Sequence, residues 1–489
     1  MLFNSLQFAI FFPLVFVAVL SLGSLRGPSL GPHRLRARNG LLLLASYAFY
    51  GSWDARFLSL IVFSTLVDYG VARLMAVIPA GDRRRKRLLL VSLVSNLGLL
   101  AFFKYFGFFT TSAAEFLAAL GLNVSAPTLQ IVLPVGISFY TFQTLSYTID
   151  VYRGRCEVER SLLNFATYVA FFPQLVAGPI ERAVDLLPQF SQDRPVRRQQ
   201  LETGTWLIAW GLFKKVVIAD NLSVIADAGF LLSEPTGSQA LVAVYAFAWQ
   251  IYCDFSGYTD IARGTSRLLG FELRLNFDLP YFAKGPSDFW RRWHISLSSW
   301  LRDYLYIPLG GNRGGEARTR FNLAATMVLG GLWHGAAWTF VWWGVFHGVV
   351  LILYRWLKPK VTSLFEEVTG PARSLLIGAH VAFFFHVVCI SWLLFRASSM
   401  EHAGRMFAAI LSGAGAAPWE SVMLLGPVHL GVSLVLGLWL VQLVQYLLRD
   451  HLFVLRLPLA ARAVIYATGA LLFLWVGRFG GSTFLYFQF

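Results

Sequence analysis

Charged residues are scarce in this sequence. Only 14% of its 489 residues are Asp, Glu, Lys or Arg, whereas 56% are hydrophobic. Soluble domains carry about a quarter charged residues, because a folded chain in water needs a polar exterior. A lipid bilayer removes that need over roughly 30 Å of hydrocarbon, and each crossing takes about 20 apolar residues. The composition therefore excludes an ordinary soluble protein and predicts an integral membrane protein.

Cysteines and the familiar motifs of soluble enzymes are scarce as well. Cys156, Cys253 and Cys389 are widely separated and match no metal-binding spacing, so we assign them to packing and expect no metal site. The sequence has no GxSxG elbow, Walker loop, GxGxxG after a strand, HExxH, or histidine followed five residues later by aspartate. The hydrolase, ATPase, dehydrogenase, metalloprotease and soluble glycerolipid acyltransferase classes thus lose their usual support.

Basic residues outnumber acidic ones by 41 to 26 and gather in short loops between apolar runs. The first run, 6–22, is followed by a basic loop. Each of the next two pairs of runs is also followed by a basic loop, at 83–87 and at 153–160. The first loop contains Arg26, Arg34, Arg36 and Arg38. This is the positive-inside pattern of membrane proteins. It predicts a multi-pass membrane protein with these basic loops in the cytoplasm, in contact with lipid and not with nucleic acid.

The apolar runs predict an all-α polytopic fold of about 11–13 transmembrane helices plus re-entrant segments. The expected spans lie near 6–22, 40–51, 56–75, 88–109, 129–150, 203–219, 241–261, 375–395, 428–447 and 463–477, with a hairpin at 321–353. The stretch 162–178 is interrupted by Pro173, which fits a re-entrant segment better than a full span. We expect one membrane-embedded domain over 1–489, with peripheral helices at about 1–110, a core at about 129–355 and C-terminal helices at about 375–480.

His334 lies near the middle of the predicted hairpin. The residues 321–353 would form roughly 50 Å of helix at 1.5 Å per residue, too long for one span and enough for a tight hairpin. An ionisable side chain at that depth generally faces a bundle interior, and the neighbouring glycines leave room for a ligand or another backbone. A neutral imidazole there can act as general base on a hydroxyl. A core histidine hydrogen-bonded between helices explains the same spacing equally well.

His294 is the second candidate. It follows Arg291 and Arg292 in a polar, aromatic-rich stretch, 263–320, which we expect at or dipping into the cytoplasmic interface. One interpretation is an interfacial anchor, since Trp and Arg both favour the headgroup level. The other is an ionisable group that orients an acyl donor or completes an acid-base pair, with the arginines available to phosphates.

Two further groups of residues could face the protein interior. Asp254, Ser256, Tyr258 and Asp260 end an apolar run, and their spacing favours the polar lining of a tunnel over a metal site. The other group consists of His347, His380 and His386, and the sequence does not separate a functional role from packing for them.

Six segments together resemble the membrane-bound O-acyltransferases, in the bacterial branch that includes the alginate O-acetylation membrane protein and the D-alanyl transfer protein of teichoic-acid modification. They are 133–140 (LPVGISFY), 172–180 (FPQLVAGPI), 254–258 (DFSGY), 276–312, 333–335 (WHG) and 484–489 (FLYFQF). The resemblance covers nearly the whole chain, and 306–314 (YIPLGGNRG) with the overall length makes it similar to the alginate type in particular. It implies a ring of helices around a central tunnel, with His334 catalytic and His294 a second functional position.

The resemblance also implies a reaction. An acyl group, foremost acetyl, would pass from a cytoplasmic thioester such as acetyl-CoA to an acceptor on the outer face, for O-acetylation of an exported polysaccharide such as alginate. The substrate thioester would need no permanently bound cofactor. The residues expected to bind it are Lys284, Arg291, Arg292, Trp293 and Asn312. An extracytoplasmic partner of the SGNH-hydrolase type and the polysaccharide export machinery would complete the system. The bacterial branch also implies a place in the bacterial inner (cytoplasmic) membrane.

Three alternatives stay open at the level of the sequence. The first is transfer of D-alanyl or another acyl group to a cell-envelope polymer. The second is a transporter or channel for an acylated or anionic small molecule, which broken helices at mid-membrane would support, although repeated halves are not visible. The third is a scaffold for export machinery, which leaves a histidine between glycines in mid-span unexplained.

Overall fold

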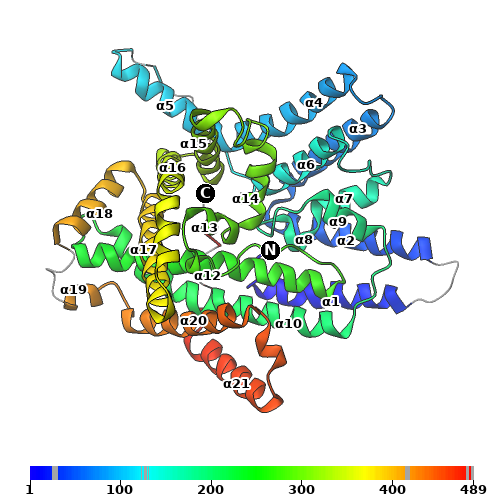
Figure 1. Cartoon of the computed structure of the whole chain (residues 1–489). Helices are drawn as coiled ribbons and strands as arrows, with labels where there is room; N and C mark the ends of the chain where they lie inside the picture. Colours follow the sequence, from blue (N-terminus) through cyan, green and yellow to red (C-terminus); the bar gives the residue numbers. More distant parts are fainter. Residues whose placement is uncertain are drawn as a thin grey trace. The chain divides into compact units, whose positions relative to one another are not determined.

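Every secondary-structure element of the described residues is helical (Figure 1). The computed structural model describes residues 1–24, 31–122, 124–125, 129, 131–413, 419–480 and 484–485. Arg26 of the first basic loop and 486–489 of the last motif lie outside these residues. Among the described residues, seven helical stretches are long and apolar enough to cross a membrane. The prediction of an all-α polytopic membrane protein is therefore confirmed.

The seven stretches match most of the predicted spans. They are Leu6–Gly23, Pro32–Ala76, Arg83–Ala119, Trp338–Glu367, Gly370–Arg396, Val428–Leu448 and Leu459–Val476. The segments expected to span near 129–150, 203–219 and 241–261, and the first half of the hairpin at 321–334, contain helices that are not among these seven. The first of them is short because its helix begins only after Gly136, which has a left-handed φ of 77°. The total of about 11–13 spans, which counts such segments, stays a prediction.

The chain forms two compact units. Unit 1 comprises Met1–Ile208 and Thr259–Arg274, and unit 2 comprises Ala209–Tyr258 and Leu275–Phe489. The single domain over 1–489 and its three-part division stay predictions.

Unit 1 is built on the N-terminal helices. They are α1 (Leu6–Ser24), α2 (Gly31–Asp54), α3 (Leu58–Ala76), α4 (Arg83–Leu100), α5 (Phe106–Ala119), α6 (Ile137–Tyr152), α7 (Leu162–Ala170), α8 (Phe172–Leu175), α9 (Ala183–Phe190) and most of α10 (Arg198–Leu212). Helices α3, α4 and α6 pack on one another, and a buried Asp68 between them accepts hydrogen bonds from Ser92 and Asn96. The predicted re-entrant stretch is broken at Phe171, between α7 and α8, and its re-entrance stays a prediction.

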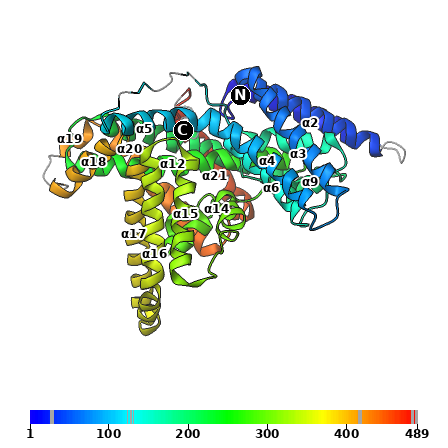
Figure 2. The ribbon, with the colours of Figure 1, turned by 90° about the horizontal axis from the view of Figure 1, so that it is seen from above.

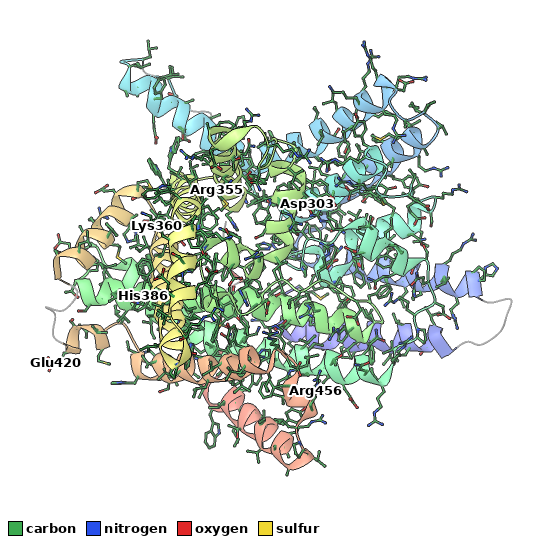
Figure 3. All side chains as sticks on the ribbon, viewed as in Figure 1. Asp303, Arg355, Lys360, His386, Glu420 and Arg456 are labelled. Atoms are coloured by element: carbon green, nitrogen blue, oxygen red, sulfur yellow. The ribbon has the colours of Figure 1, made fainter. Side chains whose placement is uncertain are left out.

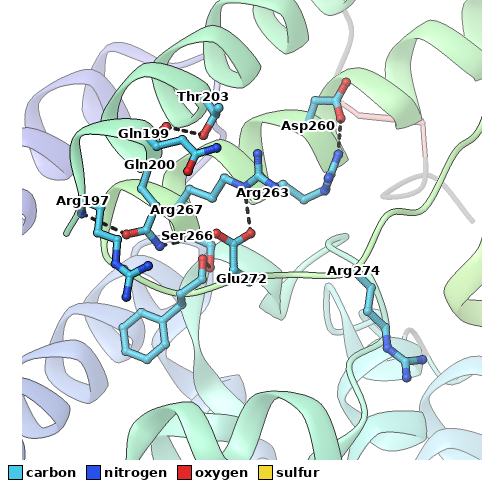
Figure 4. Close-up of polar contacts among 12 residues, drawn as sticks. Arg197, Gln199, Gln200, Thr203, Asp260, Arg263, Ser266, Arg267, Glu272 and Arg274 are labelled. Carbon is cyan, nitrogen blue, oxygen red and sulfur yellow. Dashed lines mark hydrogen bonds and ion pairs between the residues drawn. The ribbon is translucent and has the colours of Figure 1, made fainter. Parts of the chain in front are cut away.

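A polar cluster joins the start of α10 to the 260–274 segment of unit 1 (Figure 4). Arg267 pairs with Glu272 at 2.8 Å, and the Gln200 amide donates to the same carboxyl group at 3.4 Å. Arg263 pairs with Asp260 at 3.3 Å. Deeper in the unit, Glu181 accepts the backbone N–H of Arg274 at 2.8 Å, and burial raises the pKa of this carboxyl to about 7.

Unit 2 contains the longest helices and the predicted hairpin. Its elements include a π-helical segment η4 (Phe213–Ala219), α11 (Asp220–Leu231), the first part of α12 (Gly237–Leu268), α13 (Pro286–Arg292), α14 (Ile295–Leu301), α15 (Gly315–His334), α16 (Trp338–Glu367), α17 (Gly370–Arg396), α18 (Met400–Gly413), α19 (Trp419–Met423), α20 (Val428–Leu448) and α21 (Leu459–Val476). Figures 1 and 2 show α15, α16 and α17 side by side.

Glycines allow α15 and α16 to approach each other closely. A Cβ atom on Gly331 would lie 2.2 Å from the carbonyl oxygen of Phe340, and one on Gly344 would lie 2.4 Å from that of Met327. No side chain fits at such distances, so these two glycines bring backbone against backbone. Of the two uses that the sequence suggested for glycine near His334, space for a neighbouring backbone is the one observed.

Candidate active site

His334 is the last residue of α15 and lies at the closed end of the hairpin. The helix stops there because Gly335 is extended, with φ −161° and ψ 153°, and α16 begins three residues later. The side chain is 4% exposed. Its ring is 5.0 Å from those of Trp333 and Trp343 and 5.3 Å from that of Phe395, between centroids. The hairpin thus holds an ionisable imidazole inside a wall of aromatic rings.

His294 lies between the short helices α13 and α14 and is completely buried. Its φ of 44° is in the left-handed region, which is uncommon for a residue with a Cβ and costs about 1–3 kcal/mol. Such strain persists only where the surroundings fix it, and here Asn276 does so through the imidazole Nδ1 at 3.2 Å. Strained residues of this kind cluster at functional sites.

The hydrogen bonds around Asn276 fix the tautomer of His294. The backbone N–H of Ser296 can only donate, and it donates to Asn276 Oδ1 at 3.2 Å, so this atom is the amide oxygen. An oxygen accepts, so the His294 Nδ1 facing it carries the proton, and Nε2 is the basic nitrogen. Burial lowers the pKa of His294 to about 3, because a charged imidazole would lose its hydration. His294 is therefore neutral at physiological pH, with its lone pair on Nε2.

The fold brings the two histidines together within unit 2. Their ring centroids are 6.4 Å apart and the rings are inclined by 61°. Trp333 contacts both, at 5.0 Å from His334 and 5.8 Å from His294. Two imidazoles at this separation can act on one reacting group, one as a base and the other as a positioning hydrogen-bond partner. Their chemical roles stay predictions.

The residues predicted to bind the donor are spread over three settings. Arg291 is largely exposed, whereas Arg292 donates to Asp288 at 3.1 Å and to the Asp278 carbonyl at 3.0 Å. Lys284 is also exposed, just before α13. Trp293 is 1% exposed, and its ring stacks in the core 4.7 Å from Trp392. Asn312 is exposed in the loop before α15 and accepts a hydrogen bond from Tyr306. Donor binding by these residues stays a prediction.

Asp254 and Ser256, expected to line a tunnel, lie in a buried ion network that sequence reasoning missed. Asp254 pairs with Lys215 at 2.7 Å, and Lys215 also pairs with Asp220 at 2.8 Å. Lys214 donates to Ser256 at 2.9 Å. Both lysines lie in the π-helical segment η4. Their place inside a predicted span was the available signal, because a cation there needs a buried partner. Asp254 also accepts the backbone N–H of Leu485 at 2.8 Å.

The three remaining histidine candidates are one buried, one half-buried and one exposed residue. On α17, His380 is half-buried with a ring nitrogen near the carbonyl of Lys284, and His386 is exposed with a ring nitrogen near the carbonyl of Ala382 (Figure 3 labels His386). His347 is 2% exposed and lies 4.6 Å from Trp343, whose ring also contacts His334. Sequence reasoning thus missed His347 as a neighbour of the histidine pair. Within the described residues, no group of three or more His, Cys, Asp and Glu could hold a metal ion.

Comparison with known proteins gives consistent relatives. The model of "MBOAT, membrane-bound O-acyltransferase family" matches residues 157–368, which include both histidines. "Probable alginate O-acetylase AlgI" of Azotobacter vinelandii is 43% identical over 377 residues, 77% of this chain and 73% of that protein. "Peptidoglycan O-acetyltransferase" of Helicobacter pylori is 36% identical over 390 residues, 74% of this chain and 71% of that protein. "Teichoic acid D-alanyltransferase" of Streptococcus thermophilus is 31% identical over 253 residues, 47% of this chain and 58% of that protein.

The family model covers four of the six segments that carried the resemblance in the sequence, namely 172–180, 254–258, 276–312 and 333–335. The matches also decide between the classes that the sequence left open, since they favour an enzyme over a transporter or a scaffold. The chain therefore belongs to the membrane-bound O-acyltransferase family and is an O-acyltransferase.

Proposed function

We propose that this O-acyltransferase moves an acetyl group from a cytoplasmic thioester, acetyl-CoA, across the bacterial inner membrane to an extracytoplasmic acceptor. The acetyl group then O-acetylates an exported polysaccharide such as alginate. The observation that carries the proposal is the pair of buried histidines, 6.4 Å apart between ring centroids, in aromatic surroundings. The relatives named as alginate and peptidoglycan O-acetylating enzymes support acetyl as the group and a sugar polymer as the destination.

His334 acts as the general base in this proposal. A ring nitrogen of His334 takes the proton of the acceptor hydroxyl while the hydroxyl oxygen bonds to the thioester carbonyl carbon. The carbonyl π electrons move to its oxygen and return as the carbon–sulfur bond breaks. The thiolate leaves and receives the proton from the imidazolium, so His334 ends neutral. Base catalysis of this kind contributes about 10²–10⁴ in rate.

His294 serves as the positioning partner. Its Nδ1 proton is committed to Asn276, so Nε2 accepts a hydrogen bond from the acceptor hydroxyl or from a reacting group beside His334. The strained backbone at His294 supports this assignment, because the fold holds the ring at one place despite a cost of about 1–3 kcal/mol.

Basic side chains near α13 suit the anionic end of the donor. Arg291 and Lys284 are exposed close in sequence to His294, and a phosphate attracts both guanidinium and ammonium groups. We further propose that the acetyl group is received by an SGNH-hydrolase-like partner protein outside the membrane, which works with the polysaccharide export machinery. D-alanyl transfer is the second candidate, and the teichoic acid D-alanyltransferase relative supports it over 47% of this chain.

The test uses purified protein in lipid nanodiscs with radiolabelled donors. Acetyl-CoA and a D-alanyl thioester are supplied separately, each with and without periplasmic extract. We expect label from acetyl-CoA in macromolecular material only when the extract is present. Transfer of D-alanine without acetyl would replace the proposal by its alternative, and no transfer from any donor by folded protein would overturn both.

A further inference from the structure

Three rings beside His334 form a contact cluster, which we call the Trp290–Trp343–His347 cluster. Trp343 and His347 are one turn apart on α16, and their ring centroids are 4.6 Å apart. Trp290, from α13, lies 5.7 Å from Trp343 and 5.0 Å from His347. All three belong to unit 2, and Trp343 also contacts the His334 ring at 5.0 Å. The cluster therefore adjoins the imidazole that acts as the base in the proposed reaction.

Each ring of the cluster carries a buried polar atom that has no hydrogen-bond partner in the part of the chain that the structure describes. The atoms are Trp290 Nε1, Trp343 Nε1 and His347 Nε2. A buried polar group without a partner is rare, and each instance needs an explanation. Three such atoms on mutually contacting rings indicate a ligand group that these atoms bind together.

The chemistry of the atoms defines that group. An indole N–H only donates, so the missing partner of both indoles is a hydrogen-bond acceptor. Imidazole Nε2 is a further donor in the tautomer that carries its proton there. The rings carry no formal charge when His347 is neutral, and a site without a cation suits a neutral acceptor better than a phosphate. A carbonyl oxygen, with two lone pairs, meets this description. The donor in the proposed reaction brings such an oxygen to His334.

We propose that the Trp290–Trp343–His347 cluster binds the acyl carbonyl oxygen of the thioester donor, an inference that rests on the proposed function. When the acceptor oxygen bonds to the carbonyl carbon, the carbonyl π electrons move onto this oxygen. The two indole N–H groups then face a developing negative charge, which strengthens their hydrogen bonds more in the transition state than in the ground state. The electron pair on this oxygen then re-forms the carbonyl π bond as the carbon–sulfur bond breaks, and the thiolate leaves with the negative charge.

The test removes single N–H groups while keeping the aromatic rings. Trp343→Phe and Trp290→Phe each delete one donor. Trp342→Phe is the matched control, because Trp342 directly precedes Trp343 on α16 and is 50% exposed. We expect kcat for acetyl transfer to fall by about 10²–10³-fold in Trp343→Phe, as when one oxyanion-binding donor is lost, with Trp290→Phe in the same direction and the control unchanged.

Binding of two unreactive donor analogues separates carbonyl recognition from general packing. Acetonyl-CoA keeps a carbonyl oxygen near the sulfur, and S-ethyl-CoA has none. We expect both variants to bind acetonyl-CoA about tenfold more weakly, the equivalent of one hydrogen bond, and to bind S-ethyl-CoA as the wild type does. Trp290→Phe carries the test if Trp343→Phe does not fold.

Each result has a definite meaning. If the folded variants lose affinity for both analogues equally, or keep the wild-type kcat while the wild type is active, the carbonyl-binding role is overturned and the proposed function stands. A wild type that neither binds acetyl-CoA nor transfers acetyl overturns both.

Discussion

Replacing Asn276 by Asp tests the arrangement that holds His294. The carboxylate keeps an oxygen where Asn276 Oδ1 now accepts from Ser296 and from the imidazole, so the local hydrogen bonds persist. It adds a negative charge near Nδ1, which is 3.2 Å from that oxygen in the native protein. A neighbouring opposite charge favours the protonated imidazole and shifts its pKa by about 1–3 units.

The direction of the effect follows from the sign of the shift. Burial lowers the pKa of His294 to about 3, so the native ring is neutral over the whole physiological range. In Asn276→Asp the pKa rises, so the ring gains a proton at a higher pH and loses the lone pair on Nε2. We expect the acidic limb of the kcat/KM profile to move upward by about 1–3 pH units, with activity near pH 8 largely retained.

Asn276→Ala gives the contrasting perturbation. It leaves the Ser296 N–H and hydroxyl and the His294 Nδ1–H without their acceptor, at about 1–3 kcal/mol for each buried donor. We expect a clearly lower unfolding temperature and loss of activity at every pH. Acetyl transfer measured from pH 3 to pH 9 and thermal unfolding in detergent are the assays. An unshifted pH profile in Asn276→Asp together with native stability in Asn276→Ala would show that Asn276 does not hold His294 in place.

Three further predictions concern stability. Gly331→Ala should destabilise the hairpin by about 1–3 kcal/mol or more, because its Cβ would lie 2.2 Å from a backbone oxygen, whereas Gly378→Ala, with nothing within 4 Å, should unfold like the wild type. Lys215→Met should lower the free energy of unfolding by about 3–5 kcal/mol, because two buried carboxylates lose their cation. Arg405→Met, which breaks an exposed pair, should lower it by at most about 1 kcal/mol, and thermal unfolding compares the two. The pKa of Glu181 is raised to about 7, so the folded state binds the extra proton and stability should fall as pH rises from about 4.5 to about 7; Glu181→Gln should remove this dependence.

The hairpin around His334 could be predicted from the sequence because its length and its basic ends leave few choices. At 1.5 Å per residue the weakly polar stretch is too long for one span, and the glycines within it permit close helix packing. The structure has the turn directly after His334, followed by α16. Length, charge and glycine act locally, so the sequence displays them.

The cluster beside His334 could not be predicted in the same way. Trp342 and Trp343 are neighbours in the sequence, yet the first is 50% exposed and the second 1%. A helix that is apolar on all sides does not reveal which face packs on protein and which faces lipid. The assignment comes from α13 and α17, which place Trp290 and Trp392 against Trp343. The pairing of Lys215 with Asp254 depends in the same way on packing between distant segments.

Acetyl transfer by His334→Ala, beside the wild type and His386→Ala, directly tests whether His334 is the catalytic base. His386 is an exposed histidine on α17 and serves as the matched control. Each protein is purified in nanodiscs, checked for folding and supplied with labelled acetyl-CoA and periplasmic extract. We predict that His334→Ala loses transfer by about 10²–10⁴-fold and remains folded, while His386→Ala matches the wild type. Turnover in folded His334→Ala at the wild-type rate would show that His334 is not the catalytic base.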